Sequence, residues 1–556
     1  MTREPCRRGS LRHPPSAFLL RECGPLIAAA VCATSAALFL PQQEIWIDET
    51  TQITGLAMGP AGVVGWLMAP TSADTPIPGD RMPPLSYWLG QAWAALFGPT
   101  ETSLRAMGVV CVAVAAGLTF AAAGRAFGPA AGWAAGLLFA LSPNVAYTGV
   151  EIRAYPLFLL TSAGALHAAV PLLERGVRRP RETVALAVWL IAGFFVHFFA
   201  VVLAGAILTA LAADALSARR RPRLVLVPTA GLAVAAAGLV PFLFGAVEMS
   251  DELDNPGNRD RAGELLQLAA RTLGHPAQKA VPGAAELSLF AAAVLGLTGL
   301  AAAGRRRRVW RLLVLALAAG AAATAAATFA ADRFQAARPQ YSLWMLPMLF
   351  TVLSAGTTVP TARVRRMARA AAAVLLAGQA VGSAVMWTHG DHFVRCPQRR
   401  LIAMIDSLGG PDRVAVVLDE SDEYRSLFFP LYLHYGRALR VWVPAGTDTP
   451  GARSFLERAA AGRPVREVTS EAPVVVVLRK RWVTASELAG RLRGGDPAFP
   501  PGRLLRELAV GDPPVPRVIT GYMEMRADVV GERTRRPATT IGRSVPPADP
   551  GTGLTP

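Results

Sequence analysis

The 556-residue chain has little charge and few cysteines. Charged residues make up 17% of the chain, whereas hydrophobic residues make up 52%. This composition excludes an ordinary soluble protein, and the apolar runs repeatedly approach the roughly 20 residues with which a helix crosses a bilayer. The cysteines show no C-x-x-C spacing, so they indicate neither a zinc site nor a disulfide framework. They are Cys6, Cys23, Cys32, Cys111 and Cys396.

Acidic residues are fewer than basic ones, 39 against 56, which gives a formal net charge of +17. The arginines do not form one basic domain, which argues against nucleic acid as a partner. They cluster in short gaps between apolar runs, at 175–181, 219–223, 305–311 and 363–369. Such gaps face the cytoplasm, so the chain crosses the membrane an even number of times between them, which predicts about 11 spans. We predict a plasma (inner) membrane protein with its N-terminus in the cytoplasm and its C-terminus outside.

The predicted division of the chain follows from these spans. Residues 1–23 form a cytoplasmic segment, and the apolar run at 24–41 lacks a small-residue cleavage site, so we interpret it as a retained first span. Residues 24–388 form the α-helical transmembrane domain, with a large external loop at 42–103. The apolar stretch 183–216 lies between two basic clusters and must therefore form two spans, with a turn near His197.

A second domain is predicted at 389–533, outside the membrane. Short apolar strands at 414–418, 439–443 and 474–478 alternate with helical patterns such as 485–492, which is typical of a small α/β domain with a largely parallel sheet. It contains no Gly-rich phosphate loop. Residues 534–556 are rich in Pro, Gly, Thr and Arg and are predicted to be a disordered tail.

Polar residues concentrate on the predicted outer face. The acidic pair Asp48 and Glu49 follows the first span, and Glu151 and Arg153 precede the fourth, with Tyr155 just before Pro156 at its start. No charged residue lies near the middle of a predicted span. A transporter or lipid flippase is expected to carry ionisable groups there, so a transport function is the weaker alternative.

The order of the motifs is informative. After the acidic pair come Met82-Pro83-Pro84 with an aromatic segment, Ser103-Leu104-Arg105, the run at 151–155, and Arg338-Pro339-Gln340-Tyr341. This series resembles the membrane glycosyltransferases of the GT-C fold, in particular the protein mannosyltransferase and aminoarabinose transferase-like family that uses polyprenyl-phosphate sugars. The resemblance covers about residues 24–200 well and continues more weakly to Tyr341. Many relatives have His-Pro-Pro where this chain has Met82, so a substrate contact by that histidine is absent or replaced.

The resemblance implies an enzyme that transfers a hexose or pentose, with inversion, from a polyprenyl-phosphate donor to a hydroxyl of a protein, lipid or polysaccharide on the outer face. It makes Asp48 the candidate general base and Glu49 the second candidate. The leaving phosphate requires cationic partners, which arginine supplies in a bidentate manner. The candidate donor-binding residues are Glu151, Arg153, Tyr155, His197, Arg338 and Tyr341.

Several alternatives stay open from the sequence. Glu151 and Arg153 alone could be a local ion pair, His197 could be a satisfied histidine at a turn, and Arg105 is favoured as structural. A divalent metal is possible, with Glu44, Asp48 and Glu49 as candidate ligands, although no Asp-x-Asp motif requires one. A non-catalytic cell-envelope assembly protein is a third function class. The sequence identifies neither the sugar nor the acceptor.

Overall fold

The structure is a computed structural model in which most of the chain is described. The described residues are 22–68, 82–175, 180–217, 280–330 without 303, 342–389, 398–418, 424–435, 440–442, 474–480, 518–520 and 523–531, with isolated positions between 229 and 277 and at 438. The predicted cytoplasmic segment, apart from its last two residues, the predicted helix at 485–492 and the predicted tail lie outside these residues.

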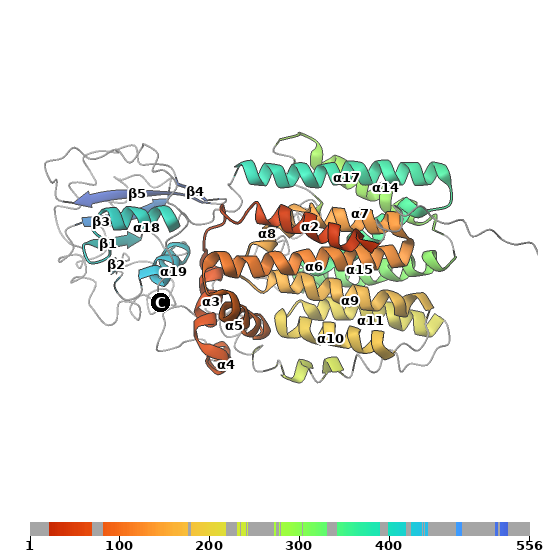
Figure 1. Cartoon of the computed structure of the whole chain (residues 1–556), viewed down its shortest axis with the longest axis horizontal. Helices are drawn as coiled ribbons and strands as arrows, with labels where there is room; N and C mark the ends of the chain where they lie inside the picture. The colour runs from red at the N-terminus through yellow and green to blue at the C-terminus, as the bar shows by residue number, and fades with distance from the viewer. Residues whose placement is uncertain are drawn as a thin grey trace, which may run out of the picture.

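The larger part of the molecule is a bundle of helices that run side by side (Figure 1). Its elements are α2 (Gly24–Ala37), α6 (Glu101–Phe127), α7 (Pro129–Ala140), α8 (Pro143–Gly149), α9 (Tyr155–Arg175), α10 (Pro180–Val196), α11 (Ala200–Ser217), α14 (Ala284–Gly299), α15 (Gly304–Ala330), η3 (Leu343–Met345), α16 (Leu346–Ser354), η4 (Ala355–Thr358) and α17 (Ala362–His389). Within the described residues, 5 helices are long and apolar enough to cross a membrane, namely α6, α9, α11, α15 and α17. The predicted class, an α-helical membrane protein, is confirmed.

The shorter apolar helices coincide with other predicted spans. They include α2, α7 and α14, together with the segment Leu343–Thr358. The predicted span at 129–147 is divided into α7 and α8, because Pro143 opens α8 and its ring interrupts the preceding helical hydrogen bonding. The stretch 183–216 forms two helices with a turn at His197, as predicted. The predicted span at 224–247 lies largely outside the described residues.

Small residues allow the helices around α6 to approach closely, as is usual for helices packed in membranes. A Cβ atom built on Gly108 would lie 2.6 Å from the carbonyl oxygen of Gly149, and one on Gly24 would lie 2.1 Å from the ring of Phe120. Gly108 therefore sets how closely α6 passes the end of α8, just before the polar turn at 150–153.

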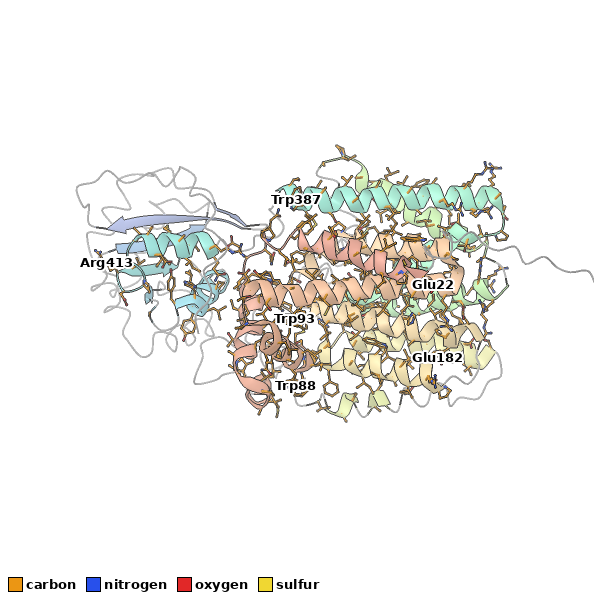
Figure 2. All side chains as sticks on the ribbon, viewed as in Figure 1. Glu22, Trp88, Trp93, Glu182, Trp387 and Arg413 are labelled. Carbon is orange, nitrogen blue, oxygen red and sulfur yellow. The ribbon has the colours of Figure 1, made fainter. Side chains whose placement is uncertain are left out.

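The two ends of the bundle differ in character. At one end, Glu174 forms salt bridges with Arg125 and Arg305, each at 3.5 Å, and Arg308 forms one with Asp214. At the other end lie Trp88, Trp93 and Trp387 (Figure 2). Arginines from the ends of α6 and α15 thus share one end of the bundle, as the positions of the predicted cytoplasmic gaps require.

The described residues of the first loop form three short helices at the end of the bundle where Trp88 and Trp93 lie. They are α3 (Ile47–Ala57), α4 (Gly59–Met68) and α5 (Leu85–Phe97). The aromatic segment that follows Pro84 forms α5. Trp66 and Tyr87 pack edge to face with centroids 6.0 Å apart, and Val63 and Leu67 complete the cluster. Gly55 lets α3 approach, because a Cβ atom there would lie 2.4 Å from the Tyr87 ring. These contacts fix α3, which carries the acidic pair.

The smaller part of the molecule lies beside this end of the bundle (Figure 1). It contains α18 (Gln398–Ser407), α19 (Tyr424–Tyr435) and the strands β1 (Val414–Leu418), β2 (Arg440–Trp442), β3 (Val474–Lys480), β4 (Val518–Thr520) and β5 (Met523–Gly531). The described strands form one sheet in the order β2-β1-β3-β5-β4.

The three strands predicted from apolar runs are present and pair in parallel, with Val416 opposite Val441 on one side and opposite Val476 on the other. The other described strands of the sheet were not predicted, and β5 runs antiparallel to both β3 and β4. Only two residues separate β4 from β5, a length that suits a hairpin and is far too short for a parallel crossover.

Candidate active site

Glu49 is the most completely paired acidic residue of the site. Its side chain is 0% exposed and that of Arg105 is 1% exposed. Arg105 donates from both terminal nitrogens to the two carboxylate oxygens, at 2.7 and 3.0 Å. The backbone N–H of Ile152 donates to the same carboxylate at 2.9 Å. This bidentate pair joins α3 to α6 and to the turn after α8.

Arg105 has further acceptors within reach. Its Nε donates to Glu101 at 2.9 Å, and one terminal nitrogen donates to the carbonyl oxygen of Val150 at 2.5 Å. The buried guanidinium is therefore surrounded by oxygen atoms from three segments. Such an arrangement is needed because a buried charge without partners costs several kcal/mol, about 3–5 when one member of a pair is removed.

Asp48 has a different environment, although it adjoins Glu49. Its side chain is half-buried, and within the described residues no hydrogen bond or salt bridge engages its carboxylate. Its backbone carbonyl accepts a hydrogen bond from Arg153 Nη1 at 2.8 Å. The Arg153 guanidinium carbon lies 5.5 Å from the centre of the Tyr155 ring. Both acidic residues occupy the first turn of α3, where the helix dipole favours negative charge.

His197 lies in the turn between α10 and α11 and is buried beneath Tyr155. Its ring stacks on Phe158 with centroids 4.7 Å apart and lies 5.6 Å from the Tyr155 ring. Burial, with a smaller contribution from the charge of Arg153, lowers the pKa of His197 to about 3. Its Nδ1 accepts from the N–H of Phe199 at 3.1 Å, so the neutral ring carries its proton on Nε2, which has no partner in the described part of the chain.

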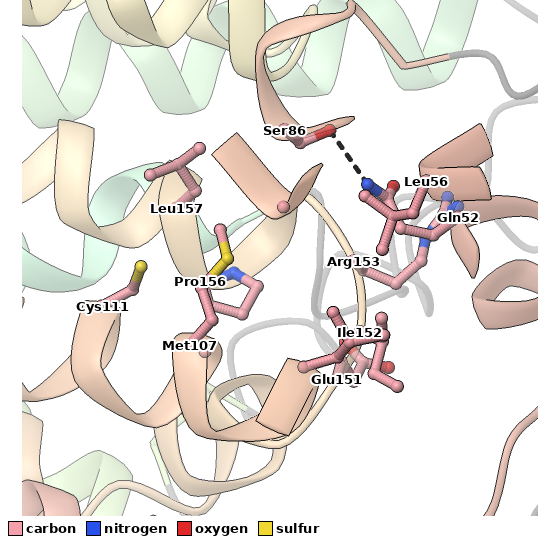
Figure 3. Close-up of a pocket in the computed structure, with 13 residues that line it drawn as sticks. Gln52, Leu56, Ser86, Met107, Cys111, Glu151, Ile152, Arg153, Pro156 and Leu157 are labelled. Carbon is pink, nitrogen blue, oxygen red and sulfur yellow. Dashed lines mark hydrogen bonds between the residues drawn. The ribbon is translucent and has the colours of Figure 1, made fainter. Parts of the chain in front are cut away.

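A pocket lies next to this cluster. Figure 3 shows Gln52, Ser86 and Arg153 on one side of it, and Cys111, Leu157 and Met107 on the other. Gln52 Nε2 donates to Ser86 Oγ at 3.4 Å. The remaining lining residues are Leu56, Gly90, Leu104, Gly108, Glu151, Ile152 and Pro156. The pocket therefore has a polar side that comes from the first loop and the 151–153 turn, and an apolar side that comes from α6 and α9.

The structure brings together most of the predicted site residues. Asp48, Glu49, Glu151, Arg153 and Tyr155 gather at the junction of α3 with the start of α9, and His197 lies directly below Tyr155. The other two predicted residues, Arg338 and Tyr341, lie outside the described residues. Met82 of the Met-Pro-Pro motif packs against the hydrophobic core.

Sequence reasoning did not assign Arg105, Gln52 and Ser86 to the site. Arg105 carried the strongest available signal, because an arginine near the start of a membrane span is costly unless it pairs with an acidic group. Gln52 and Ser86 gave no signal beyond their place in the first loop.

The acidic residues do not form an evident metal site. Within the described residues there is no group of three or more His, Cys, Asp or Glu side chains that could hold an ion. Of the candidate ligands, Glu49 is committed to Arg105, and Glu44 accepts from the backbone N–H of Arg399 at 3.0 Å. A cation bound by all three would have to displace these partners.

Comparison with known proteins shows which proteins the chain resembles. Residues 81–244 match the family model of dolichyl-phosphate-mannose-protein mannosyltransferases. The structure resembles ArnT from Cupriavidus metallidurans bound to undecaprenyl phosphate, with a TM-score of 0.54 and 14% identity over 93% of this chain and 98% of ArnT. Against ArnT in the apo state the TM-score is 0.51 and the identity is 13%, over 91% of this chain and 98% of ArnT. No curated protein sequence matches the chain.

These findings confirm the resemblance to GT-C glycosyltransferases that the motif order indicated. The likeness to ArnT extends over nearly the whole of both chains, so it includes the smaller domain as well as the bundle. The segment matched by the family model contains Arg105, Glu151, Arg153 and His197, but begins after the acidic pair.

Proposed function

We propose that the protein is an inverting membrane glycosyltransferase that moves a sugar from a polyprenyl-phosphate donor to an acceptor hydroxyl at the outer face of the plasma membrane. The observation that carries this proposal is the contact between Asp48 and Arg153. Asp48, whose carboxylate has no partner among the described residues, accepts a hydrogen bond from Arg153 through its backbone carbonyl, and Arg153 lines a pocket whose far wall is apolar. An anionic lipid headgroup with a hydrocarbon tail fits that division of polarity.

Asp48 is the proposed general base. It takes the proton of the acceptor hydroxyl as the acceptor oxygen forms a bond to the anomeric carbon of the sugar. The bond from that carbon to the phosphate oxygen breaks, and the polyprenyl phosphate leaves with the electron pair. A positioned base contributes about 10² to 10⁴ in rate. Glu49 is less suited to this role, because Arg105 occupies both of its oxygens.

Arg153 is the proposed partner of the donor phosphate. It lines the pocket, and a guanidinium there can stabilise the negative charge that develops on the leaving oxygen. The apolar side of the pocket, with Met107, Cys111 and Leu157, would receive the first part of the hydrocarbon tail. Arg338 and Tyr341 remain candidates for further donor contacts.

His197, next to Tyr155, is the residue that we propose to orient the donor. Since its pKa is lowered to about 3, the ring is neutral at physiological pH, and its Nε2–H is available as a hydrogen-bond donor. Its stack on Phe158 holds the Tyr155 ring near Arg153. No step of this mechanism passes through a metal ion.

The experiment that tests the proposal uses a deletion strain in which the lipid-linked donor accumulates. Full-length protein restores its consumption, and Asp48→Asn is expected to lower the rate of consumption about 10²- to 10⁴-fold, as loss of a general base does. Mass spectrometry of the lipid extract identifies the sugar and measures the rate in membranes.

Glu286→Gln is the matched control, because Glu286 is an exposed acidic residue in the first turn of α14. It should behave as the wild type. Full activity of a correctly folded Asp48→Asn protein would remove Asp48 from the role of base. Movement of the lipid across proteoliposomes without release of polyprenyl phosphate would instead identify a flippase.

A further inference from the structure

An arginine of the smaller domain holds the connection between α2 and α3. The guanidinium of Arg399, in the first turn of α18, donates to the carbonyl oxygens of Pro41 at 3.0 Å and Gln43 at 3.1 Å. The backbone N–H of the same residue donates to Glu44 Oε2 at 3.0 Å. These contacts lie directly before α3, so they fix the path on which the chain enters the helix that carries Asp48.

The same guanidinium is linked to the buried ion pair. Arg399 Nη2 and Arg105 Nε donate to one oxygen of Glu101, at 3.0 and 2.9 Å. Arg105 in turn holds Glu49. The exposed fraction of the side chains falls along this series, from 48% for Arg399 and 22% for Glu101 to 1% for Arg105 and 0% for Glu49. A continuous chain of polar contacts thus runs from the domain boundary to the base of α3.

Arg399 belongs to a unit that also contacts α3 directly. Gln398 Nε2 donates to the carbonyl oxygen of Pro430 at 3.1 Å, and the hydroxyl of Tyr435 donates to Asp406 at 2.8 Å, which ties α18 to α19. Helix α19 packs against α3. The smaller domain therefore holds α3 both through its entry segment and along the helix itself.

We propose that Arg399 is a positioning residue of the active site, which sets the place of Asp48 by fixing the entry into α3 and by sharing Glu101 with Arg105. This inference rests on the proposed function. Its physical basis is that general-base catalysis depends on the base lying within hydrogen-bond reach of the acceptor hydroxyl. A shift of α3 by about 1 Å is enough to lower a rate about 10²-fold.

The test compares Arg399→Ala with Arg413→Ala in the full-length protein in proteoliposomes. Arg413 is an exposed arginine of the same domain, so both variants lose one positive charge. The lipid-linked sugar that accumulates in the deletion strain serves as the donor. Arg399→Ala is expected to lower kcat about 10- to 100-fold and to change KM for the donor less than threefold, because the base moves whereas the pocket remains.

Two further measurements separate positioning from a general loss of structure. Hydrogen exchange of the amides in 47–57 is expected to become faster in Arg399→Ala than in Arg413→Ala. Millimolar guanidinium is expected to restore part of the kcat of Arg399→Ala, because the two carbonyls and Glu101 form a site that the free ion can enter. Arg399→Lys keeps the charge but lacks the planar fork, so its kcat should fall at least about threefold even if the alanine variant does not fold.

The proposal is overturned if the kcat of folded Arg399→Ala or Arg399→Lys lies within twofold of that of Arg413→Ala, if exchange in α3 is unchanged, or if guanidinium restores nothing. Hydrogen exchange does not depend on turnover. Faster exchange in α3 together with a wild-type protein that transfers no sugar would therefore contradict the proposed function and leave the contact between the domains established.

Discussion

Substituting either member of the buried pair between Glu49 and Arg105 should lower the free energy of unfolding, and the two single substitutions should lower it by different amounts. Glu49→Gln keeps the shape of the side chain and one acceptor for the N–H of Ile152. Arg105 then loses its bidentate partner but keeps Glu101, whose side chain is 22% exposed. The remaining carboxylate offsets part of the loss, so we expect about 3 kcal/mol, the lower end of the range for breaking a buried ion pair.

Arg105→Met should cost more. Glu49 would keep only the N–H of Ile152 while being 0% exposed, and the carbonyl oxygen of Val150 would lose the donor that reaches it at 2.5 Å. We expect about 5 kcal/mol, the upper end of the same range. In the double variant neither charge remains, so its cost should lie well below the sum of the two single values.

The assay is the free energy of unfolding, measured by titrating a denaturing detergent into mixed micelles and following tryptophan fluorescence. The expected losses correspond to about a 10²-fold change in the folding equilibrium for Glu49→Gln and between about 10³- and 10⁴-fold for Arg105→Met. Glu286→Gln again supplies the control. A loss for Glu49→Gln within about 0.5 kcal/mol of that control, which is the usual range of surface substitutions, would refute the reasoning.

Two further predictions follow from packing and from protonation. Gly108→Ala places a Cβ atom 2.6 Å from the Gly149 carbonyl oxygen, so it should cost about 1–3 kcal/mol and lower transfer activity by moving the 150–153 turn, whereas Gly65→Ala, which meets nothing within 4 Å, should not destabilise α4. Burial lowers the pKa of His197 to about 3 from an unfolded value of about 6.5. The unfolded state therefore binds the proton first, and the stability present above pH 6.5 is lost as the pH falls toward 3. Between pH 7 and pH 4 the melting temperature of His197→Phe should consequently fall less than that of the wild type. Equal decreases would contradict a buried, neutral His197.

The sequence predicted that the site residues lie at one end of the bundle. This follows from whether an even or an odd number of spans separates them from the basic clusters. Once the arginine clusters at 175–181 and 305–311 share one end of the bundle, Asp48, Glu151 and His197 must share the other. The helices themselves were predictable for a related reason, since a backbone in lipid has to satisfy its hydrogen bonds within each span. The turn at His197 followed from the same count.

The division between Asp48 and Glu49 was not predictable. The two are adjacent on α3 and therefore point in directions about 100° apart. Which of them meets Arg105 depends on the rotation of α3, and that rotation is set by contacts such as Gly55 against Tyr87. Nothing in the local sequence specifies these contacts. The antiparallel strand β5 was missed for a simpler reason, because its pattern mixes charged and apolar residues and offers no apolar run.

The charges at the head of α3 bear on how a phosphate could be bound there. Among the described residues, Arg105 forms a bidentate pair with Glu49 and also contacts Glu101, and Arg399 pairs with Glu101. Neither guanidinium could bind a phosphate without weakening these pairs. A donor phosphate adds negative charge, which is unfavourable in a low-dielectric setting unless a cation accompanies it. Arg153, which lines the pocket, is therefore the arginine that we propose for the phosphate, and Arg338, on the same predicted face, is the residue that we propose for a second contact.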